Sequence, residues 1–328
     1  MGAHFFEYVS SFFDKFNPYF EREKFIDLAN IAAQYLPLHC RIKLLDLKKK
    51  GNISGYLLIK SLKTENRIPK TPFQNSSCMA RGSYYSEFWL TMIASILGEP
   101  FSYESEGDGF MYHNVKPSRG NEDTLSSQSS RILLDFHTET AFHPFLPDFL
   151  LLYCLRQDRH REASTIVSSI REAVDELDPE IVNTLRQPLF KTGIDYSFGS
   201  NNGTRGNGPV LSILYGDEKD PLITFDPDLM IGLTKKAEEA QKILKSALDA
   251  KRKSILLEPG DMLIIDNRRA LHGRNSFKAY YDGEDRWLQR LYVTRDLMQA
   301  EILFSKRQRI IDYNFFEEKR EKIYANTA

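Results

Sequence analysis

The stretch RILLDFHTE, residues 131–139, joins a short apolar run to two side chains that can bind a metal. A run of this length with polar neighbours, here Arg131–Phe136, indicates a β-strand. Side chains at positions i and i+2 of an extended segment point to the same side, so His137 and Glu139 would converge there. An isolated pair of this kind is a weak signal, and the site needs a third ligand.

The best third ligand is His272, in Leu271-His272-Gly273, which follows the apolar run DMLIID at residues 261–266. Two histidines and one carboxylate on one face of a metal leave three positions open. That geometry suits iron(II), where a bidentate keto acid and dioxygen must also bind. Catalytic zinc also uses two histidines and a glutamate, so these ligands alone leave iron and zinc both open.

The run RWLQRLYVT, Arg286–Thr294, is compatible with a strand whose two sides alternate. Arg286 and Arg290 would lie on one side, roughly 13 Å apart, together with Leu288 and Tyr292. The other side would carry Trp287, Leu291 and Val293. An arginine that faces an apolar interior needs an anionic partner, and a ligand carboxylate is a natural one. The alternative is an edge strand with two solvated arginines.

Other segments suggest an α+β domain around a β-barrel or sandwich. Apolar spacing and a following glycine predict a helix over Ser83–Leu97, and a second helix is expected over Ser164–Leu177, before Asp178-Pro179. A composition rich in Lys, Glu and Ala predicts a solvated helix over Leu233–Lys253, and a short apolar run predicts a strand within Gly55–Leu62. The segment YYDGED, Tyr280–Asp285, is a hairpin signal with Asp282-Gly283 as its turn. Polar loops occupy Glu104–Ser130 and Gly199–Pro209, and loops of this kind often act as lids.

Composition narrows the classes of partner. The 328 residues include 44 Lys and Arg against 45 Asp and Glu, which leaves no global field for nucleic acid or an anionic membrane surface. No signal peptide and no apolar run of membrane-spanning length is found. Cys40, Cys78 and Cys154 form no CxxC pair, which favours reduced thiols. We therefore expect a soluble, cytoplasmic protein with a small-molecule partner.

In combination, three segments resemble the clavaminate synthase-like branch of the 2-oxoglutarate oxygenases: HTE at 137–139, LHGRNSF at 271–277 and DRWLQR at 285–290. The resemblance covers roughly residues 101 to 296 and implies a double-stranded β-helix (jelly-roll, cupin-like) barrel core with flanking helices and an inserted helix. It also implies a single oxygenase domain over residues 1–328, with a helical part over 1–100, the barrel over 101–296 and a charged tail over 297–328.

The resemblance implies Fe(II), 2-oxoglutarate and O2 at this site, with succinate and CO2 released on hydroxylation. The family's 2-oxoglutarate-binding arginine stands fourteen residues after the distal histidine, which matches Arg286. A second arginine, matched by Arg290, holds the carboxylate of the substrate. Thr165, twenty-eight residues after His137, matches the threonine that helps to bind the keto acid.

The resemblance also implies a pocket for a free basic amino acid. Ser127 matches a serine that contacts the substrate, and Glu106 matches the acid or amide that binds the α-amine. Asp226 and Asp228 resemble two aspartates that receive a cationic side chain; without the resemblance, a solvated Asp-Pro turn is favoured. His143 is interpreted as core packing, and His113 is given no role.

The predicted reaction is hydroxylation of L-lysine at C3 or C4, slightly ahead of L-arginine. Two alternatives stay open: an oxygenase acting on a carrier-tethered or peptide-embedded residue, and a zinc-loaded or inactive barrel that serves as a binding module. Arg290 argues against a tethered substrate, because a peptide lacks the free carboxylate that this arginine would bind.

Overall fold

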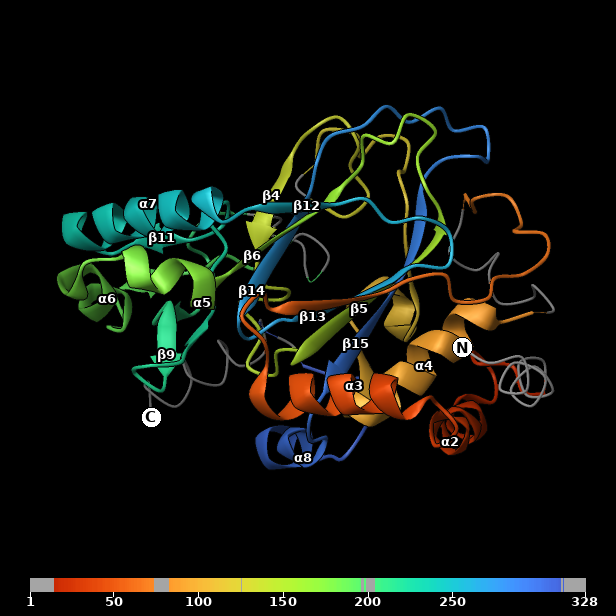
Figure 1. Cartoon of the computed structure of the whole chain (residues 1–328). Helices are drawn as coiled ribbons and strands as arrows, with labels where there is room; N and C mark the ends of the chain where they lie inside the picture. The colour runs from red at the N-terminus through yellow and green to blue at the C-terminus, as the bar shows by residue number, and fades with distance from the viewer. Residues whose placement is uncertain are drawn as a thin grey trace, which may run out of the picture.

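Two mainly antiparallel β-sheets form the centre of the computed structural model, which describes residues 15–73, 83–124, 126–195, 198, 204–313 and 315 (Figure 1). The seven-stranded sheet contains, in order, β1 (Tyr56–Ile59), β13 (Met262–Asp266), β5 (Phe149–Arg156), β15 (Trp287–Thr294), β2 (Glu99–Tyr103) and β16 (Ile310–Ile311), with β3 (His113–Val115) paired to β15. The four-stranded sheet contains β12 (Lys253–Ile255), β6 (Thr165–Ser169), β14 (Ala270–Arg274) and β4 (Leu134–His137).

Helices cover the outer faces of these sheets. The N-terminal group contains α2 (Arg22–Ala33), α3 (Leu38–Lys50) and α4 (Tyr85–Leu97), and α8 (Met298–Phe304) follows β15. The second group contains α5 (Ile170–Ala173), α6 (Pro179–Leu185) and α7 (Lys235–Ala250). The remaining elements are short: η2 (Gly107–Gly109), η3 (Val174–Glu176), β7 (Phe190–Lys191), β8 (Val210–Leu211), β9 (Leu214–Gly216), β10 (Pro221–Ile223) and β11 (Ile231–Gly232).

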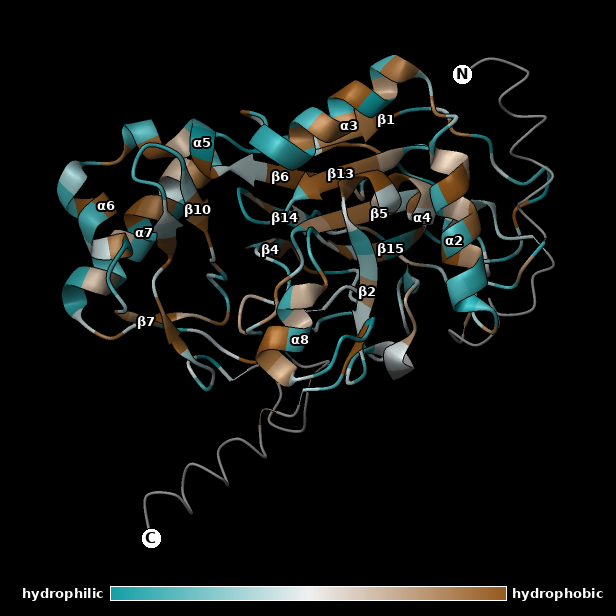
Figure 2. Cartoon of the chain, turned by 90° about the horizontal axis from the view of Figure 1, so that it is seen from below, coloured by the Kyte–Doolittle hydropathy of each residue, from teal (hydrophilic) through white to brown (hydrophobic). Residues whose placement is uncertain are grey.

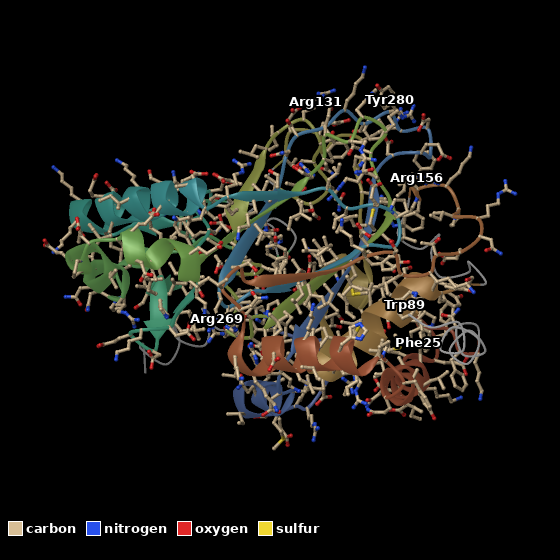
Figure 3. All side chains as sticks on the ribbon, viewed as in Figure 1. Phe25, Trp89, Arg131, Arg156, Arg269 and Tyr280 are labelled. Atoms are coloured by element: carbon tan, nitrogen blue, oxygen red, sulfur yellow. The ribbon has the colours of Figure 1, made fainter. Side chains whose placement is uncertain are left out.

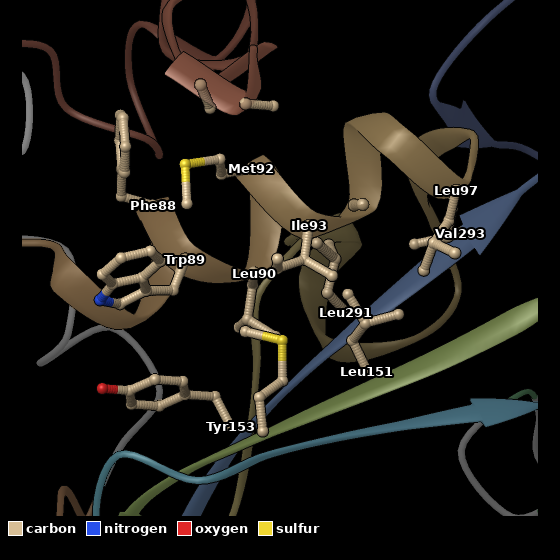
Figure 4. Close-up of a cluster of buried hydrophobic side chains, with 14 of the residues drawn as sticks. Phe88, Trp89, Leu90, Met92, Ile93, Leu97, Leu151, Tyr153, Leu291 and Val293 are labelled. Carbon is tan, nitrogen blue, oxygen red and sulfur yellow. The ribbon is translucent and has the colours of Figure 1, made fainter. Parts of the chain in front are cut away.

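The helix α4 joins the N-terminal helices to the seven-stranded sheet. Most of its apolar side chains are buried, and the helix packs against α2 on one side and against β5 and β15 on the other. Figure 4 shows Ile93 beside Leu291 and Leu151, and Trp89 beside Tyr153. Each large side chain buried in this way contributes roughly 1.5–3 kcal/mol to folding. The apolar outer face of the sheet is thus closed by a helix.

The helix α7 covers the four-stranded sheet with a single apolar stripe. Ala237, Ala240, Leu244 and Leu248 are buried at helical spacing, and they share a cluster with Phe136, Ile166 and Leu271 from β4, β6 and β14. A third cluster fills the space between the two sheets, so the molecule is layered as helices, sheet, inner core, sheet and helices. In Figure 2 hydrophobic residues dominate central strands such as β13, while the outer helices carry residues of both kinds.

Several predicted elements are confirmed. The helices expected at 83–97 and 233–253 are α4 and α7, the apolar runs at 55–62 and 261–266 contain β1 and β13, and the run at 131–136 overlaps β4. The two sides of β15 are also as predicted: Trp287, Leu291 and Val293 join the outer cluster, while Leu288 and Tyr292 join the inner one.

The helix predicted over Ser164–Leu177 is wrong. The segment begins as strand β6, which pairs with β12 on one side and β14 on the other, and only residues 170–176 are helical. Its first residues, Thr165, Ile166 and Val167, are β-branched, which favours a strand once partners are present on both sides. The fully apolar run of β5 was not among the predicted strands, because a continuous apolar run fits a buried helix as well as a central strand.

The hairpin predicted at Tyr280–Asp285 is also wrong, because the strands on either side of it, β14 and β15, belong to different sheets. The segment is instead a loop with Gly283 at φ 88°, and Asp285 accepts hydrogen bonds from the backbone of Tyr280 and Tyr281. Arg159 pairs with Asp282 across it. Figure 3 shows Arg156 and Tyr280 at this end of the molecule, with Arg269 at the other.

These sheets and helices are consistent with a cupin-like jelly-roll core. Within the described ranges, however, no hydrogen-bonded ladder joins the two sheets, so a closed barrel is not formed. The seven-stranded sheet also draws β1 and β16 from outside residues 101–296. In the described part of the chain, no helix combines the length and the apolar character that crossing a membrane requires.

Candidate active site

His137, Glu139 and His272 converge between the two sheets. The strands β4 and β14 are neighbours, and His137 and His272 are direct partners in their ladder. Oε2 of Glu139 lies 3.1 Å from Nε2 of His272 and 4.0 Å from Nε2 of His137. One ligand atom from each residue falls within 4.8 Å of the others, so two nitrogens and one oxygen can bind a single metal ion. This donor set fits iron(II) or zinc.

Backbone contacts hold the first two ligands in place. Nδ1 of His137 lies 3.0 Å from the carbonyl oxygen of Asp135, an arrangement that leaves Nε2 free to bind a metal. The amide of Glu139 donates to Oδ1 of Asn267 at 2.9 Å. The next residue, Thr140, has φ 50°, which is unusual for a β-branched residue and turns the chain away from the site.

Gly273 allows the two ligand strands to approach. A Cβ atom at this position would lie 2.4 Å from the carbonyl oxygen of Leu134 and 2.9 Å from that of Asp135. Any larger residue would therefore push β14 away from β4 directly beside His272. The glycine of the Leu-His-Gly motif is explained by this close contact.

The second oxygen of Glu139 has its own partners. Oε1 accepts hydrogen bonds from Nη1 of Arg290 at 2.8 Å and from the hydroxyl of Tyr292 at 2.6 Å. Burial opposes ionisation of Glu139, but Arg290, His272 and His137 together hold its pKa well below the usual range. Arg290 also forms an ion pair with Glu106, so the predicted substrate arginine lies between two buried carboxylates.

Arg286 is a buried cation without a carboxylate partner in the described ranges. Its nearest polar contact is Oγ1 of Thr165, at 3.5 Å from Nη2. Burial lowers the pKa of Arg286 to about 10. A buried guanidinium of this kind is stabilised by a bound carboxylate, as predicted for 2-oxoglutarate.

Arg274 is buried like Arg286 and Arg290, and the sequence reasoning gave it no role. It stands opposite Thr165 in the ladder between β14 and β6. Its guanidinium donates to the backbone oxygen of Ser129 at 2.6 Å, to Oγ of Ser129 at 3.0 Å and to the backbone oxygen of Ile132 at 3.2 Å. Burial and the charge of Arg286 lower its pKa to about 9. Arg274 thus fastens the segment that follows Ser127 to the strand of His272.

Asp226 and Asp228 lie on the His137 side of the site. Thr138, between the two metal-ligand candidates, exchanges two hydrogen bonds with the backbone of Phe225, at 2.8 and 3.0 Å. Oδ1 of Asp226 accepts from the amides of Asp228 and Leu229 at 3.0 and 3.1 Å. Burial raises the pKa of Asp226 to about 6 and also raises that of Asp228. Both aspartates are partly buried and line the cavity that also holds the triad, so the turn is not freely solvated.

A single cavity of ≈ 200 Å³ brings together all ten residues that the sequence reasoning selected. They are Glu106, Ser127, His137, Glu139, Thr165, Asp226, Asp228, His272, Arg286 and Arg290. Their individual roles stay predictions. Of the predicted lid loop at 199–209, only residues 204–209 lie within the described ranges.

Some cavity residues were missed. His113 is the cross-strand partner of Arg290, and its Nδ1 lies 3.3 Å from Nη2 of that arginine. Asp195 also lines the cavity. The sequence around His113 and Asp195 contains no motif that would mark either residue as functional. His143, in contrast, is buried against aromatic rings as predicted, and burial lowers its pKa to about 3.

Comparison with known proteins gives one family and a consistent set of relatives. Residues 85–292 match the model of the taurine catabolism dioxygenase TauD, TfdA family. An L-lysine 3-hydroxylase of Catenulispora acidiphila is 36% identical over 293 residues, which cover 88% of this chain and 80% of the relative. An L-ornithine/L-arginine 3-hydroxylase of the same organism is 32% identical, over 81% of this chain and 84% of the relative. An L-lysine 4-hydroxylase of Niastella koreensis is 28% identical over 56% of this chain and 50% of the relative.

Solved structures of iron oxygenases are also similar to this chain. An asparagine oxygenase in complex with Fe(II), 2S,3S-3-hydroxyasparagine and succinate superposes with a TM-score of 0.86 at 29% identity, over 95% of this chain and 98% of that one. A non-haem iron oxygenase in complex with Fe, succinate and (3S)-hydroxy-L-Arg gives a TM-score of 0.83 at 27% identity, over 94% of this chain and 96% of that one.

Proposed function

The chain belongs to the TauD/TfdA family and is an Fe(II)- and 2-oxoglutarate-dependent dioxygenase, and on that premise we propose that it hydroxylates free L-lysine at C3. The choice of C3 over C4 follows the relatives. The lysine 3-hydroxylase matches 88% of this chain at 36% identity, whereas the lysine 4-hydroxylase matches 56% at 28%. We also propose that the two sheets form the jelly-roll of this family.

Iron(II) and 2-oxoglutarate, when bound, supply the activation of dioxygen that inserts one oxygen atom into a C–H bond, with release of succinate and carbon dioxide. In the proposal His137, Glu139 and His272 bind the metal. Arg286 and Thr165 bind the distal carboxylate of 2-oxoglutarate, because the buried guanidinium of Arg286 otherwise has no anionic partner in the described ranges. The same charge positions the keto acid along the cavity.

The amino acid is held at both of its ends. Arg290 binds the α-carboxylate and Glu106 the α-amine, since the two side chains already form a buried ion pair in which each can exchange its partner for a substrate group. Ser127 adds a polar contact from the cavity wall. At the other end, Asp226 and Asp228 receive the ε-ammonium group. The hydrogen bonds between Thr138 and Phe225 tie this acidic end to the metal ligands.

The observation that carries the proposal is the pair Asp226 and Asp228 in the cavity that holds the triad. Burial is the largest cause of both raised pKa values, and neither carboxylate forms an ion pair with a cation in the described part of the chain. A cationic side chain supplies that charge. L-Arginine is the second candidate, because a relative that hydroxylates ornithine and arginine is 32% identical and the same acidic pair can bind a guanidinium.

A screen of the twenty free amino acids and ornithine tests the proposal. Each is incubated with protein, Fe(II), ascorbate and 2-oxoglutarate; succinate is measured and the product is identified by NMR. We expect L-lysine to give the most succinate and a 3-hydroxylated product. Faster turnover of L-arginine would establish the second candidate. Turnover only of a lysine-containing peptide or carrier-bound lysine, or none with any substrate, would contradict hydroxylation of a free amino acid.

A further inference from the structure

The hydroxyl of Tyr292 lies between the two buried carboxylates of the site. It is 2.6 Å from Oε1 of Glu139 and 3.0 Å from Oε2 of Glu106. A phenol has one proton to donate, and the shorter distance directs it to Glu139. The predicted roles left Tyr292 out, although it was expected on this side of β15.

The ring of Tyr292 is fixed on several sides. It packs against Phe101 and Tyr103 with centroid separations of 5.9 and 5.6 Å, and the guanidinium of Arg290 stands 4.6 Å from its centre. The side chain is fully buried. The hydroxyl therefore has little freedom to leave Glu139.

The two oxygens of Glu139 are consequently distinct. Oε1 accepts from Tyr292 and Arg290, while Oε2 faces the imidazoles of His272 and His137. A carboxylate held in this way offers one oxygen to a metal. Three positions of a six-coordinate ion then stay open, two for a keto acid and one for dioxygen.

We propose that Tyr292 is a positioning residue whose hydroxyl holds Oε1 of Glu139, so that Oε2 alone binds the metal. The inference rests on the proposed metal site and is independent of the identity of the amino acid. Arg290 cannot perform this task alone, because it also pairs with Glu106 and is expected to bind the α-carboxylate of the substrate. Tyr292 provides a hydrogen bond to Glu139 that remains when the N–H groups of Arg290 turn to the carboxylate of the substrate.

The test is the Tyr292→Phe variant, which keeps the ring and removes the hydroxyl. Metal-free protein is titrated with Co(II), and binding is followed by the visible absorbance of the ion, without amino acid or 2-oxoglutarate. Tyr112→Phe is the matched control, because its buried hydroxyl bonds to Thr91, in the cluster on the outer face of the sheet. We expect Tyr292→Phe to weaken Co(II) binding about 10–100-fold and to change the spectrum, while the control stays within about twofold of wild type.

Two results would overturn the inference. Wild-type Co(II) affinity and spectrum in Tyr292→Phe would show that the hydroxyl does not position Glu139. A raised KM for the amino acid with unchanged Co(II) binding would assign Tyr292 to Glu106 instead. Because the titration contains no amino acid, a wrong substrate assignment cannot change the measured Co(II) affinity or spectrum. Failure of the wild-type protein to bind Co(II) would reject the metal site itself.

Discussion

Arg286 and Asp226 carry opposite charges in the same cavity, and neither has a charged side-chain partner within ion-pair distance in the described part of the chain. Burying a charge without a partner costs free energy, and the cost is recovered when a ligand of opposite charge binds. Without ligand, Arg286 is thus a cation without an ion-pair partner, and in the proposal a keto acid supplies that partner. Asp226 is a carboxylate without an ion-pair partner, and in the proposal an ammonium group supplies it. Both residues can be tested by removing the charge with a polar replacement.

Arg286→Gln is expected to abolish the increase in melting temperature that 2-oxoglutarate binding gives the wild-type protein. Loss of a bidentate, charge-assisted contact should raise the KM for 2-oxoglutarate about 10–100-fold. The variant should be at least as stable as wild type without ligand, because it no longer buries an unpaired cation. The measurement is the melting temperature with and without 2-oxoglutarate. Arg131→Gln, an exposed arginine, is the control, and a retained shift in Arg286→Gln would exclude Arg286 from the keto-acid site.

Asp226→Asn is expected to stabilise the protein and to weaken lysine binding. The pKa of Asp226 is raised from 3.8 to about 6 by burial, so folding favours its protonated form. The stability that it contributes is present below pH 3.8 and is lost as the pH rises through about 6. At pH 8 the ionised carboxylate therefore costs roughly 3 kcal/mol, which the neutral asparagine avoids while still accepting from the amides of Asp228 and Leu229.

Denaturant unfolding of both proteins from pH 4 to pH 8 measures this difference. The gain in stability should appear at high pH and disappear toward pH 4, while the KM for lysine rises and the KM for 2-oxoglutarate is unchanged. A gain that is constant with pH would mean that Asp226 does not titrate as described.

At the residue scale, the sequence predicted the triad and its neighbours because their signals are local or are spaced as in the family. His137 and Glu139 follow a strand, and Arg286 stands at a fixed distance from His272. Tyr292, His113 and Arg274 were not predicted as functional because their partners come from distant segments. The contact between Arg274 and Ser129, for example, exists only after the loop has folded over β14.

At the scale of elements, the spacing of apolar residues predicted the structure correctly where one face of the element is buried. It failed where pairing with neighbouring strands determines the structure. The alternation of β15 is visible in the sequence, whereas α7 was expected as a solvated helix and its buried apolar stripe was found only in the structure. The strand β6 is not visible in the sequence, because its pairing with β12 and β14 outweighs a helical pattern over 164–177. The continuous apolar run of β5 is explained by its central position, with β13 and β15 on either side.

The loop before β4 provides a test at this scale. Arg274→Met removes the hydrogen bonds that hold Ser129 and Ile132 and leaves their buried oxygens without a donor. We expect a loss of about 2–4 kcal/mol in the free energy of unfolding and a several-fold increase in the KM for the amino acid, through movement of Ser127. Unfolding in urea and steady-state kinetics measure the two effects. Arg252→Met, which loses one hydrogen bond to Asn275, is the control and should change neither by a comparable amount.

In the whole molecule, the candidate site and a large part of the hydrophobic core lie in different layers. The site lies between the sheets, whereas the cluster built by α2, α3 and α4 lies on the outer face of the seven-stranded sheet. This layering could not be predicted from the sequence, because it depends on which strands are neighbours. The order β1, β13, β5, β15 brings together segments from both ends of the chain.

Ile93→Ala is expected to lower stability without altering the site. Ile93 is fully buried in the outer cluster, and its truncation should cost about 2–4 kcal/mol, while Ile93→Val should cost about 1 kcal/mol. Below the melting temperature, the KM for 2-oxoglutarate and the affinity for Co(II) should match wild type. A change in either constant would show that packing on the outer face is transmitted through the sheet.

The pairing of His137 with His272 has a consequence for how the protein is made. The two histidines are direct partners in one ladder although they lie far apart in the chain. The first is synthesised long before the second, and β14 must dock beside β4 before both imidazoles can face one ion. A nascent or truncated chain that ends before residue 272 thus has no complete centre at which oxygen can react, and the enzyme becomes competent only when its long-range strand pairing is finished.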